Sequence, residues 1–364
     1  MTHALFLPHA RLDDLIRQVQ SAGYRVIGPK LEAGVIHYAE LNVAAELPWG
    51  WQAEQTPGRY RLHRSQQTLA FAWAAPAQGL KPWFFAPVEP LWRLRRTPDG
   101  FGLEPCLPDA KPIAVLGARA CDLAAVAHQD RILEHDPHYQ ARRQDALFIA
   151  LHCTHPAASC FCTSAGTGPR ASRFDLGLTE LDTGFVLEVG SPRGGSLIEP
   201  LALAGATADQ IQAAQTAVAA AAAQQTRRLP PGDLAARLAE RLDHPRWAEV
   251  AQRCLACGNC TQACPTCFCH ARRETASADG QSAEHSRHWD SCFGELHGHL
   301  AGFQVRPQTA QRYRQWLTHK LGNWWAQFGA SGCVGCGRCL TWCPAGIDLT
   351  EEVAAVLGEA PCGR

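Results

Sequence analysis

The sequence lacks a net charge, because its 34 lysine and arginine residues are matched by 34 aspartate and glutamate residues. This balance argues against nucleic-acid binding, which relies on a basic field. Long apolar runs are also missing, and the alanine-rich run at 217–223 is too short to span a membrane. The first residues lack the basic and apolar segments of a secretory signal. We therefore expect a cytoplasmic protein without a membrane span.

Motifs for nucleotide binding are absent as well. The glycine-bearing segments at 166–169 and 190–195 do not form a G-x-G-x-x-G pattern that opens a helix after a strand, and there is no Walker motif. We therefore predict no catalytic residue and no nucleotide site in the chain. Any catalysis is expected to belong to partner subunits.

Cysteine, by contrast, is abundant, with seventeen residues. Without a secretory signal, this number favours metal binding over a disulfide framework. Because the number is odd, at least one thiol must lie outside any scheme of pairs.

Two segments near the C-terminus follow the spacing C-x2-C-x2-C-x3-C-P of bacterial ferredoxins. In this pattern three thiolates on a tight loop hold one cluster and the fourth serves the other cluster. Gly258, Gly335 and Gly337 let the loops turn closely around the sulfurs. Two zinc knuckles are the alternative, which the spacing disfavours because zinc sites usually pair two separated C-x2–4-C units. We predict one [4Fe–4S] cluster on Cys254, Cys257, Cys260 and Cys343, and a second on Cys333, Cys336, Cys339 and Cys264.

A further set of thiols lies upstream. The predicted strands 112–118 and 146–153 and the helix between them form a βαβ unit, whose parallel strands end at the same edge of a sheet. Cys121 follows the first strand, Cys153 ends the second, and Cys160 and Cys162 follow on a loop able to fold over that edge. We predict a third [4Fe–4S] cluster on these four residues. A four-cysteine zinc site and unligated thiols are the alternatives.

Five cysteines are not needed by these three sets. Cys267, Cys269 and Cys292 lie between the two ferredoxin motifs, where both packing as buried thiols and an extra ligand role stay open. Cys106 and Cys362 fit no set, and we expect them to be free thiols.

The pattern along the chain predicts three parts. Residues 1–200 are expected to form an α/β domain that carries the third cluster, and 201–250 a helical connector, with a structureless linker as the alternative. Residues 251–364 are expected to form a mainly α-helical, ferredoxin-like dicluster domain. Its long insert, 265–332, ends in a predicted helix at 312–329, whose aromatic and basic face either packs in the core or docks a partner.

The elements expected in the first two parts follow from apolar periodicity and turn residues. Helices are expected at 10–26, 121–136 and 233–242, the last behind an Asp233 cap, and strands at 68–75, 82–87, 112–118, 146–153 and 184–191. A hairpin is expected to turn at 182–184.

The motifs also carry a resemblance. "GARACDL", "CFCTSAGTGP", "CPTCFC", "WDSC", "RYRQWLTHK" and "SGCVGCGRCLTWCPAGID" occur in this order. Together they resemble the iron–sulfur beta subunit of cytosolic NADP-linked nickel–iron hydrogenases, or sulfhydrogenases. The electron-transfer A subunit of anaerobic sulfite reductase is a relative with a similar layout. The resemblance implies an electron-transfer subunit that works between an NAD(P)H-linked flavoprotein and the small and large subunits of a nickel–iron hydrogenase.

The same resemblance leaves an alternative open, the corresponding subunit of a sulfite or sulfur reductase. The paired C-x2-C motifs of a nickel–iron large subunit are absent from this chain. A cysteine-rich redox sensor is a third hypothesis, disfavoured by the neutral charge and the missing helix-turn-helix pattern.

Overall fold

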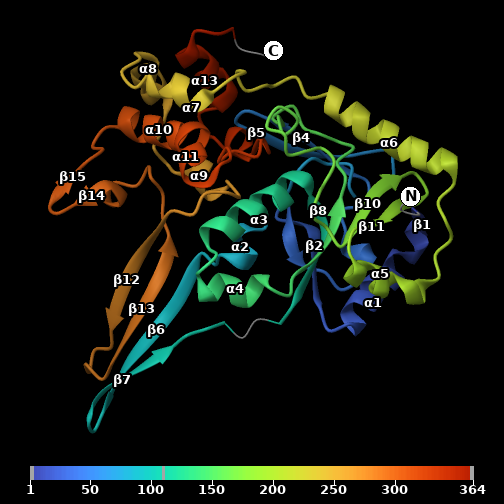
Figure 1. Cartoon of the computed structure of the whole chain (residues 1–364), viewed down its shortest axis with the longest axis horizontal. Helices are drawn as coiled ribbons and strands as arrows, with labels where there is room; N and C mark the ends of the chain where they lie inside the picture. The colour runs from blue at the N-terminus through green and yellow to red at the C-terminus, as the bar shows by residue number, and fades with distance from the viewer. Residues whose placement is uncertain (1–3, 109–110, 361–364) are drawn as a thin grey trace.

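A computed structural model describes residues 4–108 and 111–360 of the chain (Figure 1). Its largest sheet has seven strands in the order β1-β11-β10-β9-β8-β2-β3. The strands are β1 (Leu5–Pro8), β2 (Arg25–Glu32), β3 (Val35–Glu40), β8 (Ile113–Arg119), β9 (Leu147–Leu151), β10 (Leu176–Leu181) and β11 (Gly184–Val189). The four central strands β2, β8, β9 and β10 are parallel, and antiparallel strands flank them. The expected α/β character of the first part is therefore present in the structure.

The central strands are buried on both faces. Every residue of β8 and of β9 is buried, as expected for parallel strands that are covered on both sides. Alternate residues of β8 enter two different hydrophobic cores, with Ala114 and Leu116 on one face and Ile113 and Val115 on the other.

Helices cover the two faces. Leu12 and other buried residues of α1 (Leu12–Ser21) belong to the first core, with residues of α5 (Pro192–Ile198). Residues of α3 (Ala120–Ile132) belong to the second core, with Tyr139 of α4 (Pro137–Arg143). The helix α3 connects the parallel strands β8 and β9, which confirms the predicted βαβ unit.

The connector contains three helices, α6 (Ala208–Ala223), α7 (Leu234–Ala239) and α8 (Arg246–Arg253). A capping box formed by Thr207 and Gln210 begins α6. The side chain of Asp233 accepts a hydrogen bond from the N–H of Ala236 at 3.1 Å, so the predicted cap is present.

Besides a 3-10 turn (Leu296–Gly298), the described residues of the C-terminal part contain six helical segments. These are α9 (Asn259–Gln262), α10 (Thr309–Thr318), a π-helical turn (His319–Asn323), α11 (Trp324–Phe328), α12 (Arg338–Thr341) and α13 (Leu349–Leu357). The predicted helix at 312–329 thus corresponds to α10, the π-helical turn and α11. Tyr313, Trp316 and Leu317 of α10 pack in the core of this part, as the packing interpretation expects, whereas Trp325 of α11 is 51% exposed.

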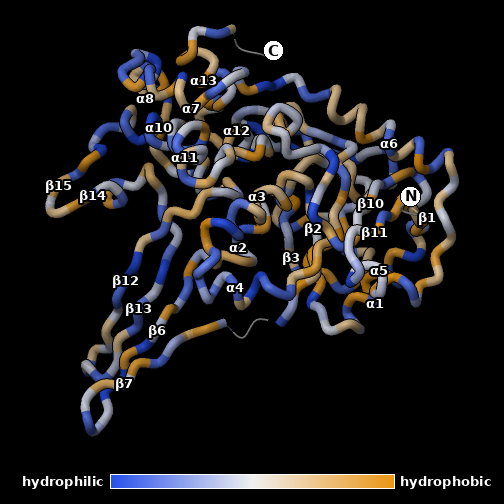
Figure 2. Tube along the Cα trace, in the orientation of Figure 1, coloured by the Kyte–Doolittle hydropathy of each residue, from blue (hydrophilic) through white to orange (hydrophobic). Residues whose placement is uncertain are grey.

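The insert also forms strands that the sequence pattern did not predict. β12 (His270–Ala276) and β13 (Ser282–Trp289) form a hairpin, and β13 pairs with β6 (Val88–Thr97) of the N-terminal half. With β7 (Gly100–Pro105), the four strands make a sheet that projects from the body as an arm (Figure 1). Figure 2 shows the β12–β13 hairpin as mostly hydrophilic, which explains why no apolar alternation revealed it.

Two predicted strands are wrong. Residues 68–75 form no regular element although 69–75 are buried, and the segment 82–87 overlaps the short helix α2 (Lys81–Phe84). In both cases an apolar run is buried by tertiary contacts rather than by a sheet. The remaining short strands form two hairpins, β4 (Trp51–Thr56) with β5 (Arg59–Arg64) and β14 (His299–Leu300) with β15 (Phe303–Gln304).

No helix among the residues described is long and apolar enough to cross a membrane.

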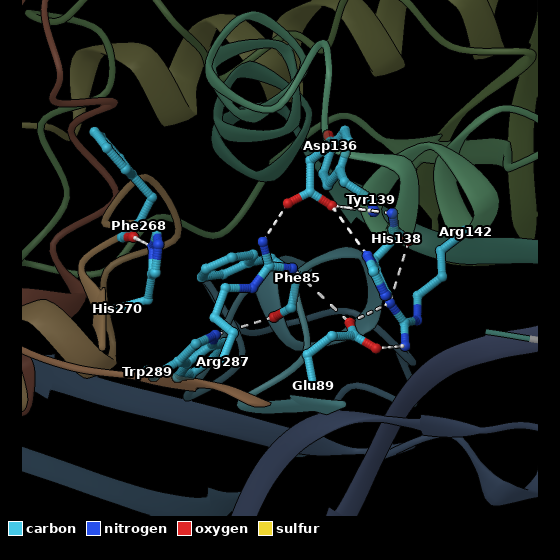
Figure 3. Close-up of polar contacts among 10 residues, drawn as sticks. All are labelled: Phe85, Glu89, Asp136, His138, Tyr139, Arg142, Phe268, His270, Arg287 and Trp289. Atoms are coloured by element: carbon cyan, nitrogen blue, oxygen red, sulfur yellow. Dashed lines mark hydrogen bonds and ion pairs between the residues drawn. The ribbon is translucent and has the colours of Figure 1, made fainter. Parts of the chain in front are cut away.

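A cluster of buried charges joins the arm to the α/β body (Figure 3). Glu89 of β6 accepts two hydrogen bonds from Arg142 of α4, at 2.6 and 2.9 Å, and its side chain is 3% exposed. Arg287 of β13 lies 3.9 Å from the same carboxylate and also forms an ion pair with Asp136. The guanidinium of Arg287 stacks on the ring of Phe85. One carboxylate therefore serves two guanidinium groups on different elements.

We expect Glu89→Ala to destabilise the protein by about 3–5 kcal/mol, because it leaves two arginines without their shared, buried partner. Chemical unfolding of the holoprotein would measure the loss. Glu104→Ala is the control, since its pair with Arg95 is more than half exposed on both sides and should contribute about 0–1 kcal/mol. Equal effects of the two substitutions would contradict the prediction.

Candidate metal centres

The first predicted ligand set lines one cavity. Its members come from the end of α8, the turn before α9, α9 itself and the segment after α12, and they are Cys254, Cys257, Cys260 and Cys343. Gly258 begins α9 with φ +77°, a left-handed conformation that suits glycine. The aromatic rings of Phe293, Tyr313 and Trp316 form the apolar wall of the same cavity.

The second predicted set is more deeply placed. Its members are Cys333, Cys336, Cys339 and Cys264, of which Cys333, Cys336 and Cys264 are buried. Burial raises the pKa of Cys333, Cys336 and Cys339, and negative charge on Cys264 raises each further. The hydroxyl of Thr266, two residues after Cys264, donates to the carbonyl of Gly332 at 2.7 Å, which holds Cys264 beside the second motif. Gly335 and Gly337 have φ +63° and +73°, as the turns of the motif require.

A buried lysine contacts this second set. Lys320 lies on the π-helical turn and is 4% exposed. Its Nζ donates to the Sγ of Cys264 at 3.2 Å, to the hydroxyl of Thr266 at 3.0 Å and to the carbonyl of Gly332 at 3.2 Å. Sequence reasoning missed this residue, although π-helical turns are frequent at functional sites.

The third predicted set also lines one cavity, together with Cys336 of the second set. Its members are Cys121, Cys153, Cys160 and Cys162. Arg119 at the end of β8 pairs with Leu151 at the end of β9 in a parallel ladder, so the two strands deliver the first two thiols to one edge. The convergence expected from the topology is present in the structure.

The loop that carries Cys160 and Cys162 packs directly on the second ferredoxin motif. The N–H of Phe161 donates to the carbonyl of Gly335 at 2.8 Å. A Cβ atom on Gly337 would lie 2.3 Å from the carbonyl oxygen of Ser159, which is too close for any other residue. Glycine at this position therefore serves the approach of the two loops as well as the local turn.

A buried ion pair crosses the same junction. Asp122, next to Cys121, lies 2.8 Å from Arg338, and their side chains are 0% and 1% exposed. Asp122 also accepts a hydrogen bond from the hydroxyl of Tyr38 at 3.0 Å. Arg338 begins α12 inside the second motif. The pair joins residues far apart in the chain, so no local pattern could have revealed it.

The chemistry of the third cavity suits a cationic, sulfur-binding group. Burial is the largest cause that raises the pKa of Cys121, Cys160 and Cys162, the last to about 11. Thiolates at these positions need a compensating positive charge, which a bound metal centre supplies. In addition, Gln225 contributes a hydrogen bond to the Sγ of Cys162 at 3.3 Å.

A single ion fits these sites less well. Within residues 4–108 and 111–360, no group of three or more His, Cys, Asp or Glu side chains is arranged to hold one metal ion. The cysteines line cavities instead of converging on a point.

The remaining cysteines fall into different surroundings. Cys106 follows β7 on the arm, away from every set, and Cys362 lies outside the described residues. Cys267 lies beside Cys264, and Cys269 lies beside Cys292.

Comparisons with known proteins agree with the motifs. Residues 253–347 match the family described as a 4Fe-4S dicluster domain. A sulfhydrogenase 2 subunit beta from Pyrococcus furiosus is 30% identical over 286 residues, which cover 76% of this chain and 82% of that protein. No solved structure matches the chain. The chain therefore carries a dicluster domain, and it belongs to the family of sulfhydrogenase beta subunits.

Proposed function

We propose that this protein is an electron-transfer subunit that holds three [4Fe–4S] clusters in a row and relays electrons between an NAD(P)H-linked flavoprotein and a nickel–iron hydrogenase module. The proposed ligands of the first cluster are Cys254, Cys257, Cys260 and Cys343, those of the second are Cys333, Cys336, Cys339 and Cys264, and those of the third are Cys121, Cys153, Cys160 and Cys162. A bound [4Fe–4S] cluster accepts and releases single electrons, at a potential tuned by nearby charge, hydrogen bonds and solvent.

One observation carries the proposal: the second set contributes a wall to each of the other two cavities. Cys339 lines the cavity of the first set, and Cys336 lines the cavity of the third. The second set therefore lies between the other two. Cluster sites in a row that share lining residues are suited to passing electrons from one cluster to the next, rather than to holding electrons at separate sites.

The first cavity lies at the surface end of this row. Cys257 is exposed, and its neighbour Leu255 is 67% exposed. An exposed apolar side chain beside a proposed ligand favours contact with a partner subunit. In the third cavity, in contrast, three of the four proposed ligands are buried, and only Cys153 is partly exposed.

The nature of the partners is inferred from the relative. A sulfhydrogenase subunit beta from Pyrococcus furiosus is by name part of a larger assembly. We infer that the present chain likewise joins hydrogenase subunits and a flavoprotein in the cytoplasm, and that catalysis occurs on those partners. Purification of the complex from its native host under anaerobic conditions tests the assignment. A co-purifying nickel-binding subunit supports the proposal, whereas a siroheme subunit would replace it by a sulfite reductase role.

The chain alone is expected to show neither hydrogen uptake nor NADPH oxidation, because no nucleotide motif or nickel-binding pattern was found. Both activities should require the partner subunits. Anaerobic assays with an artificial electron acceptor, on the isolated holoprotein and on the complex, would measure this. NADPH turnover by the isolated chain after addition of flavin would show a nucleotide site that sequence reasoning missed.

The isolated holoprotein should contain about twelve irons per chain, four for each of three clusters. Cys160→Ala should lower this to about eight, because it removes one ligand from the third set only. EPR signals of the two ferredoxin-like clusters should persist. Cys106→Ala is the matched control and should keep all the iron. Eight irons in the intact protein, or zinc in place of four of them, would exclude the third cluster.

Lys320→Met should shift the reduction potential of the second cluster to a lower value. Reduction adds negative charge, which the buried ammonium beside Cys264 stabilises. An EPR-monitored redox titration measures the shift, while iron content should stay unchanged. Lys30→Met, far from the clusters and paired with Glu46, should leave the potential unaltered. Lys320→Arg keeps the positive charge and should therefore retain most of the original reduction potential. If the potential is the same with and without a positive charge at position 320, Lys320 does not tune the second cluster.

A further inference from the structure

Two of the thiols outside the proposed clusters meet at the base of the arm. Cys269 immediately precedes β12, and Cys292 follows the end of β13 by three residues. The last ladder pair joins His270 to Trp289, and the N–H of Asp290 donates to the carbonyl of Cys269 at 2.9 Å. The hairpin register therefore holds the two cysteines on adjacent chain segments.

The same register brings the side chains of Cys269 and Cys292 within reach of each other, and the imidazole of His297 lies beside Cys269. The Nδ1 of His297 lies 2.8 Å from the Oδ2 of Asp290, whose carboxylate holds the ring in place. The side chains of Cys292, Cys269, His297 and Asp290 thus follow one another in space in this order.

This arrangement favours a thiolate on Cys269. The interaction with Cys292 is the largest cause that lowers the pKa of Cys269, and His297 lowers it further. The pKa of His297 is raised to about 9, first by Cys269 and then, against burial, by Asp290. Lys81, held over the ring of Trp289 at 3.8 Å, adds positive charge nearby. Low pKa and a cationic neighbourhood mark reactive cysteines.

The pair is also reachable from solvent. Cys269 and Cys292 are both partly exposed, unlike Cys121, Cys160 and Cys162 of the third set, which are buried. Leu296, next to His297, is 84% exposed. Figure 3 shows the residues that flank Cys269, Phe268 and His270, to one side of the ion pairs around Arg287, while the ring of His270 packs edge-on against Phe85 of that junction.

We propose that Cys269 and Cys292 form a thiol–disulfide exchange site for small disulfides, with Cys269 as the attacking sulfur and Cys292 as the resolving sulfur. The Cys269 thiolate attacks one sulfur of an external disulfide RSSR, which forms a mixed disulfide and releases RS⁻. Cys292 then loses its proton and attacks Cys269, which releases a second RS⁻ and closes the internal disulfide.

The chemistry balances without a further reactant. Two protein thiols are oxidised, one external disulfide is reduced to two thiols, and an excess of external thiol reverses the exchange. His297 is a positioning residue, which keeps Cys269 ionised by its charge. The site does not rest on the proposed electron relay, since no electron from a cluster is required.

The test treats the holoprotein anaerobically with bis(2-hydroxyethyl) disulfide and counts released 2-mercaptoethanol by mass spectrometry. Peptide mapping of the same sample locates the disulfides. At this site the intact protein should release two equivalents and contain a Cys269–Cys292 disulfide. Cys292→Ser should release one equivalent and retain a mixed disulfide on Cys269. Cys269→Ser should release neither equivalent at this site. His297→Gln should slow the first step, the attack of Cys269 on the external disulfide.

Cys106→Ser is the matched control, because it removes a partly exposed thiol on the arm and should leave both equivalents at this site. Iron content is the second measurement and should be equal in the intact protein and in both serine variants. Loss of four irons from either variant would overturn the proposal by making these residues cluster ligands. Independent reaction of the two thiols, with no internal disulfide, would overturn it as well.

Discussion

The close approach of two loops is the constraint on which the rest of the structure depends. Ser159 and Phe161, beside the thiols of the third set, rest on the backbone of Gly335 and Gly337 in the second ferredoxin motif. Any side chain at these glycines would clash with the opposite loop. Because this contact joins the α/β half to the dicluster half, the cavity of the third set can share Cys336 with the second. The proposed relay follows from this one geometry.

Burial makes positive charge necessary around the thiols. A thiolate removed from water is costly unless a cation compensates it, and the protein places Lys320 against Cys264 and Arg338 near Cys121 and Cys336. Asp122 in turn balances Arg338, so the guanidinium is never an isolated buried charge. The same cations that make buried thiolates tolerable also favour an additional electron, which links the stability of the sites to their proposed potentials.

The two ferredoxin motifs could be predicted from the sequence because their cysteines follow a fixed spacing within a short segment of the chain. The third set could not be predicted from spacing alone. The βαβ pattern predicts that β8 and β9 are parallel neighbours, and this arrangement brings Cys121 beside Cys153. Lys320 and the Asp122–Arg338 pair gave no such signal, since each joins segments distant in the chain. The strand predicted at 68–75 failed for the same reason, because its apolar residues are buried by contacts across the fold rather than by a sheet.

The insert between the motifs unites these features. A compact pair of ferredoxin motifs needs no hairpin, yet β13 pairs with β6 and so ties the dicluster half to the α/β half a second time. The same insert supplies Lys320 to the second set and, at the base of its hairpin, the thiols of Cys269 and Cys292. The strand pairing therefore fixes the position of a partly exposed thiol pair relative to the buried sulfurs. An exchange site held rigidly in this way can respond to disulfides in solvent while the buried thiols remain shielded from them.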